Sequence, residues 1–262
     1  MLLEGVFRRY GFDFRDYAFP SIKRRIWSSI RAEGLESIFK FQGKLLHEPA
    51  CMERFLLAVT VNVSSMFRDP TFYRAFRNRV VPELRPVPFV RIWHVGCATG
   101  EEVYSMAILL QEEGLYPKCR IYATDMNEAV LAKAKTGIFP LALLQEYTAN
   151  YQRAGGVRGF SEYYTANYDH VIFERSLNEN IVFAQHNLVT DSSFNEFHVI
   201  LCRNVMIYFN DSLTRRVHRL LYDSLAVSGF LGLGNRETIK FTPHADCYEE
   251  FNGRERLYRK VK

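Results

Sequence analysis

The chain has 262 residues, of which 48% are apolar and 24% charged. That length can bury the core of one large domain, or of one domain with a small partner, and the composition is that of a soluble globular protein. No apolar stretch is long enough for a membrane span, so membrane insertion is not expected. The five cysteines are scattered without a C-x-x-C pair, which favours a reduced, cytoplasmic compartment and predicts no metal site.

The net charge of +5 is unevenly distributed along the chain. Residues 1–90 carry 15 Lys and Arg against 9 Asp and Glu, a net charge of +6, whereas residues 91–262 carry 19 against 20, a net charge of −1. The N-terminal part is therefore the part expected to meet an acidic partner.

Residues 1–83 are predicted to form a helical N-terminal domain. Ser21 is a plausible N-cap of a helix that runs to Glu33 and stops at Gly34. This helix carries four cations, and they form either a solvated basic face or a docking face for an acidic helix or nucleic acid. The four candidate docking residues are Lys23, Arg24, Arg25 and Arg31.

Two further helices are predicted before residue 84. One covers residues 53–63, and the other begins at Asp69 as N-cap, with Pro70 in its first turn, and ends near Val81. Prolines at positions 82, 86 and 88 then indicate a linker, which we place at residues 84–90.

Residues 91–262 alternate between predicted strands and helices, as in a mostly parallel, doubly wound α/β sheet. The expected strands cover residues 91–95, 120–124, 181–184, 197–202 and 230–233, and a terminal hairpin pairs 247–251 with 257–261. Asn127 is expected to cap one helix, and Asp211 another that runs to residue 227. Residues 137–185 interrupt the alternation of strands and helices, and they are predicted to contain an inserted subdomain with short antiparallel strands.

Polar residues follow the predicted parallel strands at the point where each strand ends. They are Glu101 after the turn of Gly96 and Gly100, then Asp125, Asn187, Arg203, Asn204 and Tyr208. Each has a structural alternative, since Asp125 could cap a helix, Asn187 could form a turn and Arg203 could join a surface ion pair. Because the carboxyl ends of parallel strands share one crevice, the set predicts a site for a nucleoside with an amino-acid tail.

Five ordered stretches together resemble the CheR-type chemotaxis protein-glutamate O-methyltransferases along nearly the whole chain. They are NVSSMFRDPTFY (62–73), IWHVGCATGEEVYSMA (92–107), IYATDMNEAVLAKAKTGIF (121–139), HNL (186–188) and ILCRNVMIYF (200–209). The resemblance implies a helical domain followed by a class I, Rossmann-like methyltransferase sheet with a small inserted antiparallel β-subdomain. It also implies S-adenosyl-L-methionine as cofactor and S-adenosylhomocysteine as product.

The resemblance also implies residue roles. Arg68 and Tyr208 would flank the transferred methyl group and the target carboxylate. The implied cofactor contacts are Asn62, Ser64, Arg68, Gly96, Ala98, Glu101, Asp125, Met126, Asn187, Leu188, Arg203 and Asn204. The implied partner is the acidic helical cytoplasmic region of a chemoreceptor or a related signalling protein, docked on the basic helix of residues 21–33. Nucleic acid is not expected as a partner.

The chemistry of carboxylate methylation agrees with these candidate residues. A glutamate side chain is already ionised near pH 7, so methylation of its carboxylate needs alignment and exclusion of water rather than a strong general base. Arg68 is therefore expected to position the carboxylate.

Some positions depart from the family pattern. His198 stands where the family commonly has Asp, Asn235 and Arg236 change a G-H-S-E-like turn, and the β-subdomain is reshaped, so recognition of a receptor tail peptide by that subdomain is not predicted. A methyltransferase for nucleic acid or a small molecule, and a non-catalytic cofactor-sensing module, stay open as alternatives.

Overall fold

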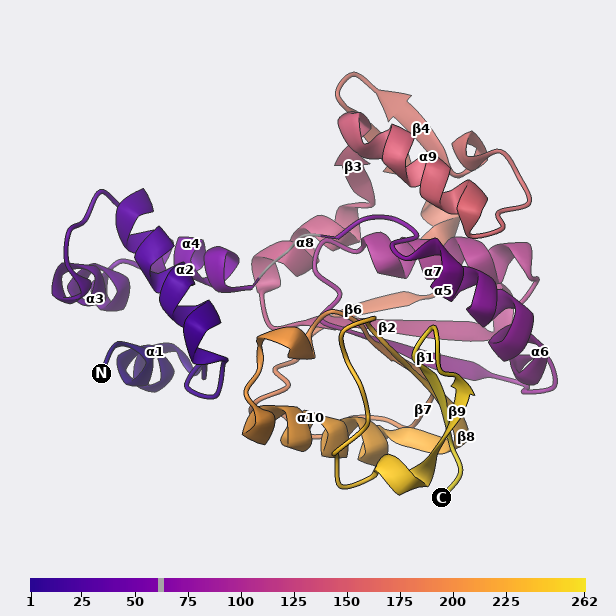
Figure 1. Ribbon diagram of the computed structural model, residues 1–262. Coiled ribbons are helices and arrows are strands. Elements are labelled where there is room, and N and C mark those ends of the chain that lie inside the picture. The colour runs from indigo at the N-terminus through magenta and orange to yellow at the C-terminus, as the bar shows by residue number, and fades with distance from the viewer. Residues whose placement is uncertain (61–63) are drawn as a thin grey trace.

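The computed structural model describes residues 1–60 and 64–262. Helices α1 (Leu2–Tyr10), α2 (Phe19–Ala32), α3 (Ile38–His47) and α4 (Pro49–Val59) form a bundle beside a larger α/β domain (Figure 1). The bundle has its own hydrophobic cluster, in which Phe14 and Phe41 pack edge-on against Phe55. The basic helix was predicted correctly except at its start, which lies at Phe19 rather than after Ser21.

The predicted helix after Asp69 is present but is longer and irregular. Helix α5 (Pro70–Ala75) continues through one π-helical segment (Phe76–Val80) into α6 (Val81–Leu84). Asp69 stands at the N-cap position with Pro70 after it, as predicted, but its side chain makes no capping hydrogen bond: its backbone is left-handed (φ 56°), and its carboxylate accepts a hydrogen bond from Arg203.

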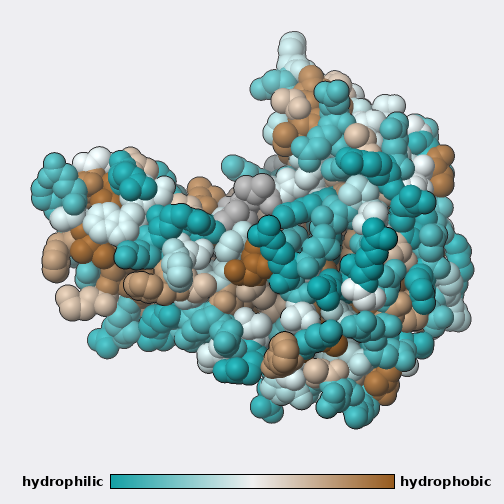
Figure 2. All heavy atoms as spheres, viewed as in Figure 1, coloured by the Kyte–Doolittle hydropathy of each residue, from teal (hydrophilic) through white to brown (hydrophobic). Residues whose placement is uncertain are grey.

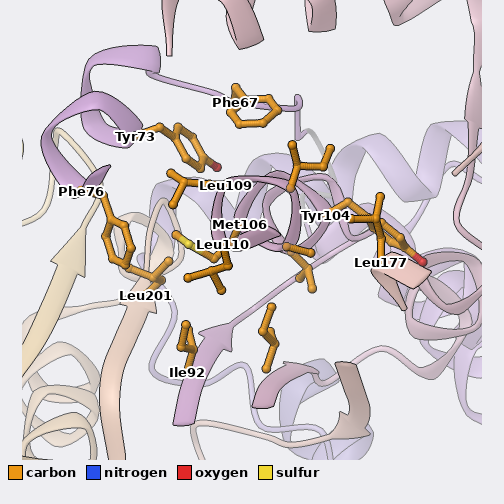
Figure 3. Close-up of a cluster of buried hydrophobic side chains, with 14 of the residues drawn as sticks. Phe67, Tyr73, Phe76, Ile92, Tyr104, Met106, Leu109, Leu110, Leu177 and Leu201 are labelled. Carbon is orange, nitrogen blue, oxygen red and sulfur yellow. The ribbon is translucent and has the colours of Figure 1, made fainter. Parts of the chain in front are cut away.

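Helices α5 and α6 pack in the core of the α/β domain rather than in the bundle. Phe76 shares one buried cluster with Ile92 and Met106, and Figure 3 shows these side chains converging between the helices and the sheet. The change from one hydrophobic core to the other therefore falls before α5, and not at the predicted linker of residues 84–90. We propose that the boundary between the two units lies near residue 60.

Seven strands form the main sheet in the order β6-β2-β1-β7-β8-β10-β9. Their bounds are β1 (Val90–Val95), β2 (Cys119–Asp125), β6 (Ile181–Gln185), β7 (Phe197–Cys202), β8 (Leu225–Leu233), β9 (Tyr248–Asn252) and β10 (Leu257–Lys260). The first five in spatial order are parallel, and β10 pairs antiparallel with both β8 and β9. The predicted doubly wound sheet and terminal hairpin are confirmed.

Helices cover both faces of this sheet (Figure 1), which explains why its central strands β1 and β7 are mostly apolar and almost entirely buried. Helix α7 (Glu101–Glu112) lies with α5 and α6 on one face, while α10 (Asp211–Ser224) packs on the other. Along β1, Ile92 faces the first cluster and Trp93 the second. Helix α8 (Glu128–Thr136) is capped by Asn127, as predicted. Within the described ranges, no helix has both the length and the apolar character needed to cross a bilayer.

The insertion between α8 and β6 contains helix α9 (Leu144–Arg153) and a second, antiparallel sheet. Strands β3 (Ile138–Pro140), β4 (Tyr164–Asn167) and β5 (His170–Phe173) pair in the order β3-β5-β4. The insertion ends earlier than the predicted limit of residue 185, because β6 pairs with β2 in the main sheet. Helix α10 likewise ends at Ser224 rather than residue 227, and β8 begins directly after it.

Candidate active site

A cavity opens at the carboxyl ends of β2, β1 and β7, where the strand order of the sheet reverses. This is the position at which open α/β sheets bind their ligands. The structure brings seven of the predicted cofactor residues together here. They are Gly96, Ala98, Asp125, Met126, Asn187, Leu188 and Asn204, and Tyr208 lies at the same cavity.

The bundle supplies the opposite wall of this cavity, through Tyr17, Val59 and Thr60. The Tyr17 ring packs edge-on against Phe209, with 5.1 Å between ring centroids, and burial raises the pKa of its phenol well above the usual range. The sequence analysis missed these residues, because nothing in a local pattern shows which side of the bundle meets the sheet.

The turn after β1 brings the backbone against its neighbours. Gly96 has φ 64°, and a Cβ there would lie 2.7 Å from a methyl group of Val205, so a larger residue would displace the segment after β7. Ala98 is also left-handed (φ 48°), and its N–H donates to the Asp125 carboxylate at 3.0 Å. The turn and the end of β2 are thus locked together.

Asp125 is buried at the end of β2, where its carboxylate accepts N–H groups from Ala98 and Asn127 at 3.0 and 2.9 Å. Burial raises its pKa, although these backbone donors oppose the shift. Each oxygen of a carboxylate has more than one acceptor site, so both can still accept hydroxyl groups from the cavity. The Asp125 side chain therefore fixes the turn before α8 and can still accept hydrogen bonds from a ligand; a ligand contact stays a prediction.

Asn187 forms the turn that was considered as its alternative role. Its side-chain oxygen accepts from the N–H of Val189 at 3.0 Å, and its own N–H donates to Asp191 at 2.8 Å. The turn places Asn187 and Leu188 on the cavity wall, and contact of Asn187 with a cofactor stays a prediction.

Arg68 and Tyr208 line a second, smaller cavity together with Ser64, next to the first. Gly96, Ala98, Asn204 and Tyr208 line both spaces. Ser64 and Arg68 also line a wide cleft beneath the β-subdomain, together with Glu101 and Lys133. The small cavity therefore shares lining residues with both the sheet-edge cavity and the wide cleft.

Glu101 and Glu102 have opposite surroundings. Glu101 is buried, accepts hydrogen bonds from Thr99 at 2.7 and 2.9 Å, and forms no ion pair within the described residues. Burial raises its pKa despite hydrogen bonds from Thr99 and Ser64. Glu102 is paired with Arg203 and His94. Glu101 is therefore the carboxylate of the two that is left for an ammonium group.

Arg203 is buried and lies at the centre of a charge network. It donates to Glu102 at 2.8 Å, to Asp69 at 2.9 Å and to the carbonyl of Arg68 at 3.3 Å. Its guanidinium also stacks on Phe72, 4.0 Å from the ring centroid. Burial alone would raise the pKa of Glu102, but Arg203 and His94 lower it below its usual range. The ion pair considered for Arg203 exists in the interior rather than on the surface, and it fixes the turn that carries Arg68.

Glu237 holds the segment after β7, and the sequence analysis did not single it out. Its carboxylate accepts four backbone N–H groups at 2.7 to 2.9 Å, from Asn204, Val205, Met206 and Gly234. Burial raises its pKa, and the four donors oppose that shift. The sequence did offer one indication of this role: Glu237 follows shortly after a parallel strand, at the sheet edge that carries the other polar residues.

The remaining predicted residues are placed as follows. Asn62 lies outside the described residues. Lys23, Arg24 and Arg31 are exposed on α2, on a bundle whose surface mixes polar and apolar residues in Figure 2. Arg25 differs from these three: its guanidinium lies 4.8 Å from the centroid of the Tyr208 ring and donates to the carbonyl of Ala58 at 2.9 Å. Arg25 is therefore turned toward Tyr208, unlike the other three cations, and docking of a partner on the four residues stays a prediction.

The donor set fits a nucleoside cofactor with an amino-acid tail. A buried carboxylate ends β2, and glycine and alanine in left-handed conformations bring backbone to the cavity. Glu101 lines the adjacent wide cleft, and it is a buried carboxylate with no ion pair among the described residues. This fold and site define a Rossmann-like methyltransferase. Two family models cover the chain: "CheR methyltransferase, all-alpha domain" matches residues 1–60, and "CheR methyltransferase, SAM binding domain" matches residues 62–254. The chain belongs to the CheR methyltransferase family.

Curated relatives agree with this assignment. The chain is 46% identical over 260 residues to a "Putative methyltransferase Cher3" of Pseudomonas putida, covering 99% of this chain and 95% of that protein. It is 29% identical to a "Chemotaxis protein methyltransferase" of Listeria innocua, over 89% of this chain and 87% of that protein. A protein of the same name from Salmonella typhimurium is 28% identical, over 89% and 81%. The chain is a protein methyltransferase that uses S-adenosyl-L-methionine.

Proposed function

We propose that this enzyme forms γ-methyl esters on glutamate side chains of a chemoreceptor's cytoplasmic helices, or of a related signalling protein. The observation that supports this most is the shared cavity of Arg68 and Tyr208, between the sheet-edge cavity and the wide cleft. A substrate side chain that enters from the cleft meets a cation and a phenol before it reaches the cofactor wall.

The cofactor supplies a sulfonium methyl group. In the transfer, a carboxylate oxygen forms a bond to the methyl carbon while the sulfur–carbon bond breaks, so that the opposite charges cancel. No proton leaves the acceptor, because the glutamate is already ionised near pH 7. The protein has to align the two groups and keep water out.

Arg68 is suited to orient the acceptor carboxylate by a charge-assisted hydrogen bond. Too tight a pairing would stabilise the anion and slow its attack, so its role is positioning. The backbone of Arg68 is held at both polar groups. Its N–H donates to the Ser65 carbonyl at 3.2 Å, and its carbonyl accepts a hydrogen bond from the buried Arg203. Tyr208 is held in the same way, since its carbonyl accepts the N–H of Ala18 at 2.8 Å.

The test is transfer of a labelled methyl group to a receptor cytoplasmic fragment, followed by base hydrolysis to detect esters. We expect base-labile label with the wild-type enzyme, and loss of most turnover, about a hundredfold or more, in Arg68→Ala. Arg219→Ala, an exposed change on α10, is the matched control and keeps its activity. Calorimetry with S-adenosyl-L-methionine checks that the variant still binds the cofactor.

Other outcomes would favour the alternatives. Base-stable label on protein, or label on nucleic acid or a small molecule, would replace the glutamate assignment with another acceptor. Cofactor binding without transfer to any acceptor would indicate a sensing module. Near-normal transfer by Arg68→Ala would contradict the positioning role.

A further inference from the structure

A groove lies behind the segment that carries Tyr208. It is formed by the first half of α10 and by the residues that follow β8, in the lower part of Figure 1. Ile207 lines this groove, whereas the next residue, Tyr208, lines the two site cavities. One short turn, Met206–Tyr208, is therefore shared by the groove and the active site.

The groove carries an excess of positive charge. Arg215, Arg236 and Lys240 line it, all three are exposed, and none forms an ion pair with another described residue. Asp211 is the exposed acid at its edge. The carboxylate of Glu237 at its floor is already bonded to four backbone N–H groups. The surface thus offers three available cations to a ligand of opposite charge.

The rim of the same groove is apolar. Phe241 is 95% exposed and has a left-handed backbone (φ 67°), a conformation that is rare for a bulky residue. Ile207, on the other side, is also exposed. An exposed aromatic ring leaves apolar surface in water, and burying it against a partner is favourable.

We propose that this groove is a second docking site for the methyl-accepting protein, and that it binds an acidic segment that carries an apolar side chain. The occupant rests on the proposed function, since it is the acceptor itself. Two basic surfaces would then flank the turn of Tyr208, because Arg25 of α2 contacts the ring from the bundle side. Engaging both surfaces raises the effective concentration of the acceptor at the site.

The test compares a charge reversal in the groove with one outside it. The double variant Arg215→Glu with Arg236→Glu removes two groove cations, whereas Arg219→Glu changes an exposed residue on the same helix that faces Asp223. We expect the double variant to raise KM for a receptor fragment about tenfold, with KM for S-adenosyl-L-methionine unchanged. Phe241→Ser should raise KM for the fragment severalfold. An unchanged KM for the fragment, or an equal rise in Arg219→Glu, would overturn the inference.

A binding measurement separates this inference from the proposed function. The probe is a fluorescent peptide of glutamates around one phenylalanine, followed by anisotropy at low and moderate salt. We expect binding to wild type and Arg219→Glu, and at least tenfold weaker binding to the double variant. Equal binding to all three proteins rejects the groove whether or not the fragment is methylated. If the fragment is never methylated but the peptide binds as expected, the acceptor assignment fails and the groove remains an acidic-peptide site.

Discussion

The two walls of the site are built differently. On the sheet side, each polar group is held by several bonds from its own domain: Asp125 and Glu237 accept backbone N–H groups, and Arg203 lies in a buried network. On the bundle side, contact depends on a few bonds across the interface, such as Ala18 N–H to the Tyr208 carbonyl and Asn210 N–H to the Asp16 carbonyl, at 2.8 and 2.9 Å. We infer that the sheet side holds its polar groups rigidly in place. The bundle side, with fewer bonds across the interface, is the part that can adjust to a partner.

The largest expected effect comes from breaking the sheet-side network. Arg203→Met removes the cation and leaves Glu102 and Asp69 without it, so the free energy of unfolding should fall by about 3–5 kcal/mol. Arg54→Met in the bundle breaks a mostly exposed pair with Glu33 and should cost about 1 kcal/mol or less. Urea unfolding measures both, and equal losses would contradict the difference between the two regions.

A smaller change on the same wall should act on catalysis. Glu237→Gln keeps the shape of the side chain but removes the charge that four N–H groups share, which should cost about 1.5–3 kcal/mol of stability. Because those groups hold the turn that leads to Tyr208, kcat should fall about tenfold. Steady-state kinetics checks this, with Glu249→Gln on the exposed part of β9 as control. An unchanged kcat would mean that the turn does not need this anchor.

The bundle wall is tested by charge reversal on α2. Lys23→Glu with Arg24→Glu should weaken binding of a receptor fragment about tenfold, because both cations are exposed and neither lines the cofactor cavity. Calorimetric affinity for S-adenosyl-L-methionine should stay the same, and Lys40→Glu on α3 serves as control. Equal loss of both ligands would indicate unfolding rather than docking.

The smallest expected effect is a shift in pH dependence. Burial raises the pKa of Glu101, so on acidification its carboxylate takes up a proton earlier than an ordinary glutamate would, and its attraction for an ammonium group is lost. Affinity for S-adenosyl-L-methionine should therefore weaken severalfold as the pH falls below neutral, starting at a higher pH than for an ordinary glutamate. Glu101→Gln should bind more weakly at pH 7 and vary less with pH. The same pH profile in both proteins would assign the dependence to another group, such as Asp125.

Much of the fold was predictable because its signals are local. The apolar strands of the sheet, the glycine turn at Gly96 and the Asn127 cap follow from residue type and spacing. The exact ends of elements were less predictable: α10 stops at Ser224 and β8 starts there because pairing with β7, rather than local propensity, decides the boundary. The helix after Asp69 could not be assigned to a unit from its own pattern, since its apolar side chains would suit either core.

By itself, the sequence determined the class of the sheet, the strand ends that carry polar groups and the family of the chain, because these are set by short-range patterns and by ordered motifs. Only the tertiary structure decided which of two adjacent glutamates remains available, that Arg203 is buried beneath Arg68, that Arg25 turns toward Tyr208 and that Glu237 anchors the segment after β7. The physical reason is the same in each case. A side chain's partner depends on residues distant in the chain, and burial makes that partnership energetically decisive.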